Sequence, residues 1–599
     1  MPASRGFLAI LLVLGCLRPA LATEPAARDL VPADTLLLLE VNHPLQLIEN
    51  PLAGDVWERI QGTHGVQQAL ASPQVEKFRQ AARFIEKSLG LDWKTGLSRL
   101  TEGGIVFAVQ PQRPDSEPVV TAIVTAADEQ VLKAFIDAAQ AEIRRQAGSS
   151  SNGASPTQTS QPEAGKSPDT ESTQYRSYAC HRVGNGRFSV IGRRLIVSNS
   201  KAGLEAALDR QAGAAPEKGF DPPPSLRLAS STGAAPVIQA TVNLKRLRED
   251  PKAGKALTLP GNDPIPVVLL GGYLDLLRRA DFGAAALFVD GPAYEFKVRV
   301  PVGSEGSYPG LRGYFASETT DAALPLLKPA GAIFSASWFR DYKKLWDARK
   351  ELFNADLVKQ IEQGDAKARS DGAHIGPSDL VGLLGPHFRV VAARSRETVY
   401  KIKLDERLPA FALVASVRDE AAFRQRVLTP VDGLLLFLIS ANQGEVKSAD
   451  YRDAKITTIR FPERADVAES DKRALYNFDP SYTLTRGQLL VGSTAEIVRD
   501  LIDELDRQGP PAAAEARPER QTDRQELSLT GLSEFLKGYQ EQFVRGAVLG
   551  QGLSPADAEK EIAIFHDLLK RLGSVTTSHT ISGDHFEIRL RLGPGEAPR

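Results

Sequence analysis

The sequence has very few sulfur-containing residues. Its 599 residues include one methionine, at position 1, and two cysteines, Cys16 and Cys180. This composition excludes a methionine-ligated copper site and a methionine-rich adaptable groove. Because we expect Cys16 to be removed or lipidated during export, Cys180 has no partner for an intramolecular disulfide. We therefore predict a fold held together by burial alone, with Cys180 as a buried, inert thiol.

The chain also lacks an excess of charge of either sign. Lysine and arginine number 73, aspartate and glutamate 74, and the formal net charge is −1. A nucleic-acid-binding surface needs a basic excess, so we expect no nucleic-acid partner. The apolar content of 42% over this length is enough for several buried cores.

No apolar run in the sequence is long enough to span a membrane. The longest near the N-terminus, 7–15, follows Arg5 and precedes small residues, which is the pattern of a secretory signal peptide over 1–22, cleaved after Ala22. A second interpretation treats 13–16 as a lipoprotein processing site with a lipid anchor on Cys16. We favour cleavage after Ala22. Either way, we predict export to the periplasm, cell envelope or extracellular space.

Similar segments recur along the chain at a nearly constant distance. The segment DLLRR (275–279) returns as DLLKR (567–571), and Gly291 returns as Gly583, in both cases 292 residues later. A near-constant offset is the pattern of a tandem duplication with small loop insertions. Each half then serves as a control for the other, because a catalytic residue found in one half only is a weaker candidate.

The repeat predicts an α+β fold made of two tandem homologous halves. We place the first half at 31–303, with a disordered loop at 148–174, a linker at 304–328, and the second half at 329–593. Strands joined by hairpins predict mainly antiparallel sheets with helices packed on one face.

The last hairpin of each half alternates apolar and polar residues with a period of two. In the first half, Tyr294, Phe296, Val298 and Val300 alternate with Glu295, Lys297 and Arg299. In the second half, Phe586, Ile588, Leu590 and Leu592 repeat the apolar series. Such alternation predicts that the apolar side is buried and the polar side is wet.

Two local signals predict helices. Ser72 and Pro73 are expected to begin a helix with one buried face that ends at Gly90. Asp128 and Asp419 each follow a strand, and we expect their carboxylates to cap the next helix.

Motifs of nucleophilic catalysis are nearly absent from the sequence. The segment 198–201 matches S-x-x-K, but the other half has no lysine there, so we interpret it as helix capping by Ser200. We therefore predict that the protein is not an enzyme and has no catalytic residues.

Three histidines, His566, His579 and His585, lie within 20 residues of one another. Leu274 and Glu295 stand opposite the first and last of them in the other half. A catalytic zinc needs three converging ligands, so we interpret these histidines as exposed or edge residues. No metal site and no cofactor are predicted.

The chain resembles a family of exported bacterial proteins known only as a domain of unknown function. Three segments carry the resemblance: Pro-Ala-Asp-Thr at 32–35 leading into a strand, the strand at 104–109, and the hairpin-plus-helix unit at 194–208. The resemblance implies export and a repeated α+β architecture. It implies no activity and no site residues.

The sequence is compatible with three functions. The leading hypothesis is a non-catalytic binding or scaffolding protein of the bacterial envelope, with envelope-protein or cell-wall partners. The first alternative is a carrier with a cavity for an apolar ligand, lined by side chains such as Phe296 and Leu590; the apolar run 434–439 could line it, but is more simply a buried helix or strand. The second alternative is a hydrolase with its site in one half only.

Overall fold

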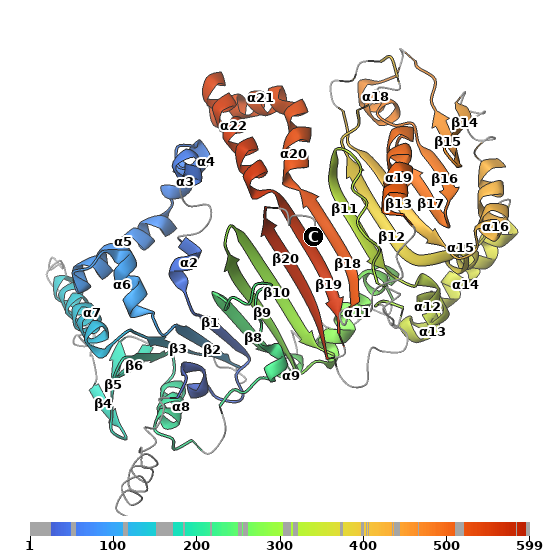
Figure 1. The fold of residues 1–599 in the computed structure, drawn as a ribbon. Coiled ribbons are helices and arrows are strands. Elements are labelled where there is room, and N and C mark those ends of the chain that lie inside the picture. The colour runs from blue at the N-terminus through green and yellow to red at the C-terminus, as the bar shows by residue number, and fades with distance from the viewer. Residues whose placement is uncertain are drawn as a thin grey trace, which may run out of the picture. The chain divides into compact units, whose positions relative to one another are not determined.

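The protein is described by a computed structural model. The residues that it describes are 25–48, 55–111, 118–150, 172–183, 186–215, 219–249, 254, 262–302, 313–315, 322–371, 375–396, 400–402, 404, 407–433, 435, 444–464, 467–509, 520–582 and 584–594. Strands and helices alternate along the chain, and the strand pairings are antiparallel, so the α+β class is confirmed (Figure 1).

The chain forms two compact units. The first contains Met1–Asn42 and Arg83–Pro222, and the second contains His43–Ala82 and Pro223–Arg599. These units differ from the halves expected from the repeat, because the last strand of the first half pairs with the last strand of the second half, and the two strands before it join the same sheet.

The first unit is built on one antiparallel sheet. Its strands pair in the order β1-β2-β3-β7-β6-β5-β4. Their bounds are β1 (Leu37–Val41), β2 (Ile105–Gln110), β3 (Val119–Thr125), β4 (Ser172–Tyr175), β5 (Tyr178–Val183), β6 (Gly186–Ile191) and β7 (Arg194–Ser198). The helices are η1 (Ala27–Leu30), α6 (Trp93–Leu100), α7 (Glu129–Ser150) and α8 (Lys201–Gln211), while α5 (Pro73–Leu89) begins in residues of the second unit.

The second unit holds a longer sheet, ordered β8-β9-β10-β20-β19-β18-β11-β12-β13-β17-β16-β15-β14. In Figure 1 the green strands β9 and β10 lie beside the red strands β20 and β19. The bounds are β8 (Ile238–Asn243), β9 (Phe282–Asp290), β10 (Ala293–Pro301), β11 (Ala332–Phe339), β12 (Leu384–Ala393), β13 (Ala410–Val417), β14 (Glu445–Tyr451), β15 (Ala454–Arg460), β16 (Ser481–Thr485), β17 (Gln488–Gly492), β18 (Arg520–Ser528), β19 (Ser574–Ile581) and β20 (His585–Gly593).

Helices of the second unit connect these strands. Their bounds are α2 (Pro44–Ile48), α3 (Asp55–Ile60), α4 (His64–Leu70), η2 (Pro224–Leu226), α9 (Leu244–Glu249), α11 (Pro264–Arg279), α12 (Tyr342–Asp347), α13 (Arg349–Leu352), α14 (Ala355–Ser370), α15 (Pro377–Leu383), α16 (Glu420–Phe423), η5 (Arg424–Leu428), α18 (Glu469–Tyr476), α19 (Ala495–Gln508), α20 (Leu529–Leu536), η6 (Lys537–Tyr539), α21 (Gln540–Gln551) and α22 (Pro555–Leu572).

The pairings of β1–β10 correspond to those of β11–β20. Within the first unit β3 pairs with β7, and in the second unit β13 pairs with β17. Likewise, the β8-β9-β10 series corresponds to β18-β19-β20. The order of elements is therefore alike in the two series, while a common origin by duplication stays a prediction.

The largest core of the second unit lies between α19 and one face of the sheet. Val498, Leu501 and Ile502 of α19 are completely buried against Val391, Val414 and Leu490. Register pairs place these strand residues on one face. We call this face B and the opposite one face A. Phe423 and Val427 pack on face A instead, against Leu484 and Leu489.

Several local expectations are confirmed. The helix after Ser72 spans Pro73–Leu89, and Gly90 follows it with φ at +67°. Asp128 accepts a hydrogen bond from Val131 N at 2.9 Å, and Asp419 accepts one from Ala422 N at 2.9 Å. Cys180 is buried. The predicted apolar face of the 73–89 helix is only partly covered, since none of its residues is fully buried.

Two predicted irregular segments contain ordered structure. Within the predicted linker 304–328, Tyr314, Phe315 and Leu327 are buried, because the segment packs into two cores of the second unit. Within the predicted loop 148–174, α7 extends to Ser150 and β4 begins at Ser172. Residues 151–171 of that loop, and residues 434 and 436–439 of the apolar run, lie outside the described residues.

Candidate functional site

Face A carries exposed apolar side chains in the middle of the sheet. Phe296 of β10 lies directly opposite Leu590 of β20 in the register, so the two side chains share this face. Their exposed fractions are 40% and 39%. Both strands have a hydrogen-bonded neighbour on each side, so the exposure is that of a sheet face and not of an edge.

Side chains around this pair are also apolar and only partly buried. Leu287 pairs with Phe296, and Thr577 pairs with Leu590 on the other side. The partly buried apolar neighbours on face A are Ala285, Leu287, Val289, Tyr294, Val298, Val575, Ile588 and Leu592. We call these residues, together with Phe296 and Leu590, the central apolar patch.

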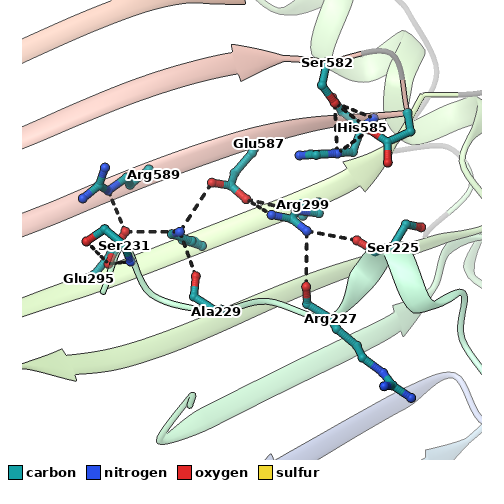
Figure 2. A network of polar contacts seen from close by, with 12 residues as sticks. Ser225, Arg227, Ala229, Ser231, Glu295, Arg299, Ser582, His585, Glu587 and Arg589 are labelled. Carbon is teal, nitrogen blue, oxygen red and sulfur yellow. Dashed lines mark hydrogen bonds and ion pairs between the residues drawn. The ribbon is translucent and has the colours of Figure 1, made fainter. Parts of the chain in front are cut away.

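The opposite side of the same strands is buried although it is ionic. Glu295 is 1% exposed and Lys297 is 7% exposed. Figure 2 shows Glu295 within a network of polar contacts that also contains Arg299, Glu587 and Arg589. The predicted orientation of this hairpin is therefore wrong around Phe296, where the charged side is covered and the apolar side is exposed, although Val300 on the apolar side is buried.

Ion pairs across the β10–β20 seam explain how the charges are accommodated. Arg589 Nε lies 2.6 Å from Glu295 Oε1, and Arg299 Nη2 lies 2.6 Å from Glu587 Oε2. Lys297 Nζ lies between the two carboxylates, at 3.4 Å from Glu295 and 3.7 Å from Glu587. Buried charges are tolerated when they are paired in this way.

The segment around η2 closes the charged side. Lys297 donates to the carbonyl of Ala229 at 2.8 Å, and Arg299 donates to the carbonyls of Ser225 and Arg227 (Figure 2). Leu226 and Leu228 of the same segment pack against Phe288 of β9. The alternation of residues in β10 carries no information about this distant segment. The sequence pattern therefore predicts the wrong side of the strand as buried.

The electrostatics of Glu295 agree with this geometry. Burial alone would raise the pKa of its carboxyl. The hydrogen bond from Ser231 N at 3.0 Å and the charges of Arg589 and Lys297 outweigh burial and hold the pKa below its ordinary value. Glu295 therefore stays ionised at neutral pH.

A second exposed apolar group lies on face A farther along the sheet. Leu413 of β13 pairs with Val491 of β17, and both are exposed together with Phe411. The registers link these residues to the central apolar patch through Thr577, Gln525, Ala336 and Val390. In the first unit, Phe107 and Val120 are exposed on one face of β2 and β3.

One end of face A is covered, and there His579 is found. Tyr273 of α11 contacts Phe586, with ring centroids 5.6 Å apart, and its hydroxyl lies 2.8 Å from His579 Nδ1. The buried pair Arg340–Asp523, at 3.1 Å, adjoins the same hydroxyl. Burial raises the pKa of Tyr273. The pKa of Asp523 is low despite its burial, because His579 and Arg340 stabilise the carboxylate. The cluster holds α11 on the sheet.

His566 is buried rather than exposed, contrary to the prediction. Its Nδ1 lies 3.0 Å from Ser533 Oγ, which joins α22 to α20. Burial, and then the charges of Lys537 and Lys570, lower its pKa, so it is neutral at pH 7. An open pocket of about 280 Å³ adjoins it, lined by Lys537, Gln540, Ala563, His566, Asp567 and Lys570.

The three histidines do not converge. His585 contacts Ser582 and Asp584, His579 contacts Tyr273 and Asp523, and His566 contacts Ser533. In the part of the chain that the structure describes, no group of three histidine, cysteine, aspartate or glutamate side chains is arranged to hold a metal ion.

The S-x-x-K segment is not arranged as a nucleophile and its base. Ser198 is buried at the end of β7 and donates to the carbonyl of Val120 at 3.1 Å. Lys201 instead forms an exposed ion pair with Glu205 at 3.7 Å. The predicted cap by the Ser200 side chain is wrong, since that side chain makes no cap hydrogen bond; Ser198 Oγ accepts from Ser200 N. Burial raises the pKa of Cys180, as expected of an inert thiol.

Known proteins resemble this chain only remotely. No family model matches it, and no curated protein does. Two crystal forms of the protein TP0453, IV and III, resemble its structure with TM-scores of 0.23 and 0.22, at 10% and 11% identity. The alignments cover 46% and 47% of this chain, and 80% and 81% of TP0453. Among the described helices, none combines the length and apolarity needed to cross a bilayer.

Proposed function

We propose that this chain is an exported, non-catalytic binding or scaffolding protein of the bacterial envelope, and that it binds its partner through the central apolar patch. The observation that carries the proposal is the exposure of Phe296 and Leu590 on the face opposite a layer of ion pairs. Contiguous apolar surface on a soluble fold is characteristic of an interaction site. The signal-peptide pattern at 1–22 supports export.

The edge of the sheet is a weaker candidate for partner binding than its face. The edge strand β14 carries Glu445, Lys447 and Asp450, and its residues are mostly exposed. Charged side chains on an edge strand discourage pairing with another chain. We therefore place the interaction on the apolar face.

A carrier with an enclosed ligand is the second candidate. It predicts that Phe296 and Leu590 line a cavity, whereas the two side chains lie on an open surface of the sheet. An open apolar face suits a macromolecular partner better than a small ligand, which is normally largely enclosed by its pocket. A hydrolase is favoured still less, because Ser198 is buried and the three histidines lie apart.

Site-specific photo-crosslinking in the native host tests the proposed function. A benzoylphenylalanine is placed at Phe296 in the full chain, and in a matched control at Lys447, an exposed position on the edge strand. We expect a protein adduct from position 296 alone, and its loss when Leu590→Ser is added. Equal adducts at the two positions, or no adduct at 296, would contradict the proposal. A lipid or small-molecule adduct at 296 would favour the carrier.

A further inference from the structure

The β10–β20 seam has a local twofold arrangement. Lys297 pairs with Arg589, Tyr294 with Leu592, and Val300 with Phe586. The offset of 292 residues that relates DLLRR to DLLKR also relates Tyr294 to Phe586 and Phe296 to Ile588. Corresponding residues thus lie at equal distances on either side of the seam centre, and the two ends of face A can be compared.

One end of the face is covered by the chain itself. Phe586 is 3% exposed, and Val267 and Leu276 of α11 pack in the same cluster. A short stretch containing Tyr314 and Phe315 completes the cover, and both of these residues are buried. The ring of Phe315 lies 5.3 Å from that of Phe586 and 5.7 Å from that of Tyr273.

The stretch that contains Tyr314 and Phe315 is held in the way that a protein holds a bound peptide. Tyr314 donates its hydroxyl proton to the carbonyl of Val268 at 2.6 Å, and its own carbonyl accepts from Arg340 at 3.1 Å. Gly272 makes room for the ring, because a Cβ there would lie 2.5 Å from Tyr314 Cδ1. Aromatic anchors and main-chain hydrogen bonds together fix the segment on the sheet.

The corresponding end is open. Tyr294 and Phe296 take the places that Phe586 and Ile588 have at the covered end, yet Tyr294 is only half-buried and Phe296 is exposed. Phe565 of α22 corresponds to Tyr273 of α11 and is 46% exposed.

We propose that this open end binds an extended segment of a partner protein that presents aromatic side chains, as Tyr314 and Phe315 do at the covered end. The inference rests on the proposed function and specifies its partner. Thr577 lies beside Leu590 and Gln525 lies beside Thr577 on the same face, so the apolar centre has polar groups at one side. A polypeptide can use such groups for hydrogen bonds, whereas hydrocarbon chains of a lipid cannot.

A peptide-binding measurement on the full chain tests the inference. The probe is a fluorescent peptide with the sequence of residues 310–318, GLRGYFASE, and the control peptide carries serine in place of its tyrosine and phenylalanine. We expect saturable binding of the probe alone, weakened about tenfold or more by Phe296→Ser, as for the loss of an aromatic anchor. Leu549→Ser, at an exposed apolar position on α21, serves as the matched control and should leave binding unchanged.

Three results would overturn the inference. The first is that binding of the probe does not saturate up to millimolar protein. The second is that Phe296→Ser leaves the binding unchanged. The third is that, in place of the peptide, the chain binds phosphatidylethanolamine–phosphatidylglycerol vesicles or a second copy of itself in a way that depends on Phe296. If the probe instead displaced the chain's own Tyr314 from the covered end, its binding would not depend on Phe296. If crosslinking at 296 captures a protein while the peptide fails to bind, only this inference fails; if both fail, the proposed function fails too.

Discussion

Individual buried charges in the second unit fall into two kinds. Glu295 has cationic partners and a backbone hydrogen bond, so it stays ionised. Asp479 is equally buried, but Ala495 N donates to its Oδ1 at 3.3 Å, and its Oδ2 has no hydrogen-bond partner in the described structure. Burial therefore raises the pKa of Asp479 to about 6. Two buried carboxyl groups, Glu295 with a lowered pKa and Asp479 with a raised pKa, thus change the stability in opposite directions as the pH rises.

Asp479 should make the protein less stable as the pH rises. Its folded-state pKa of about 6 exceeds the ordinary 3.8, so its stabilising contribution is complete below pH 3.8 and is lost as the pH rises through 6. The loss amounts to at most about 3 kcal/mol. Urea unfolding at pH 4.5 and 7.5 should show a smaller change for Asp479→Asn than for the wild type. An identical change in both proteins would exclude this role.

Glu295→Ala should destabilise the protein by about 3 kcal/mol, because Arg589 and Lys297 would lose a buried counter-charge. Glu445→Ala, which removes an exposed partner of Lys447 on β14, is the matched control and should cost less than about 1 kcal/mol. Equilibrium urea unfolding measures both. Equal effects would mean that the ionic layer is not a buried network in solution.

At the scale of elements, the sequence predicts what depends on neighbouring residues. The bounds of the 73–89 helix and the caps by Asp128 and Asp419 follow from local backbone chemistry, and the structure confirms them. Helix ends and caps of this kind depend on no distant contact. The α+β class follows in the same way, from strands that hairpins join.

Features set by distant contacts could not be predicted. The face of β10 that is buried depends on the segment around Ser225 and Ala229, far away in the sequence. The burial of His566 beside Ser533 and the partial cover of His579 by Tyr273 both depend on other elements. The carrier hypothesis from the sequence names Phe296 and Leu590 as binding residues, but places them in an enclosed cavity. Only the structure places them on an open surface.

Packing of α11 on the sheet should depend on the absence of a side chain at Gly272. Gly272→Ala would bring a Cβ to 2.5 Å from Tyr314 Cδ1, and we expect a destabilisation of about 2 kcal/mol. Gly546→Ala in α21, where nothing lies within 4 Å, should instead stabilise the protein by up to about 1 kcal/mol. Thermal unfolding of both variants would show the opposite signs; a stable Gly272→Ala variant would contradict the packing.

For the molecule as a whole, we expect hydrogen exchange to be uneven across the sheet of the second unit. Amides of β10 and β20 lie in its interior and are bonded on both sides, whereas β14 is an exposed edge. Exchange that requires sub-global opening is slower than exchange by fraying. Mass-spectrometric exchange on the full chain should find β10 and β20 among the slowest segments and β14 among the fastest. Rapid exchange at β10 would contradict a continuous sheet.

The seam between β10 and β20, in which Lys297 stands opposite Arg589, has the geometry of a symmetric dimer contact. Here one polypeptide supplies both sides, so their encounter is intramolecular and is governed by an effective concentration that the covalent connection sets. Dilution, which separates the subunits of an ordinary dimer, leaves this contact intact. The surface above the seam therefore stays assembled even where the concentration of the protein is low.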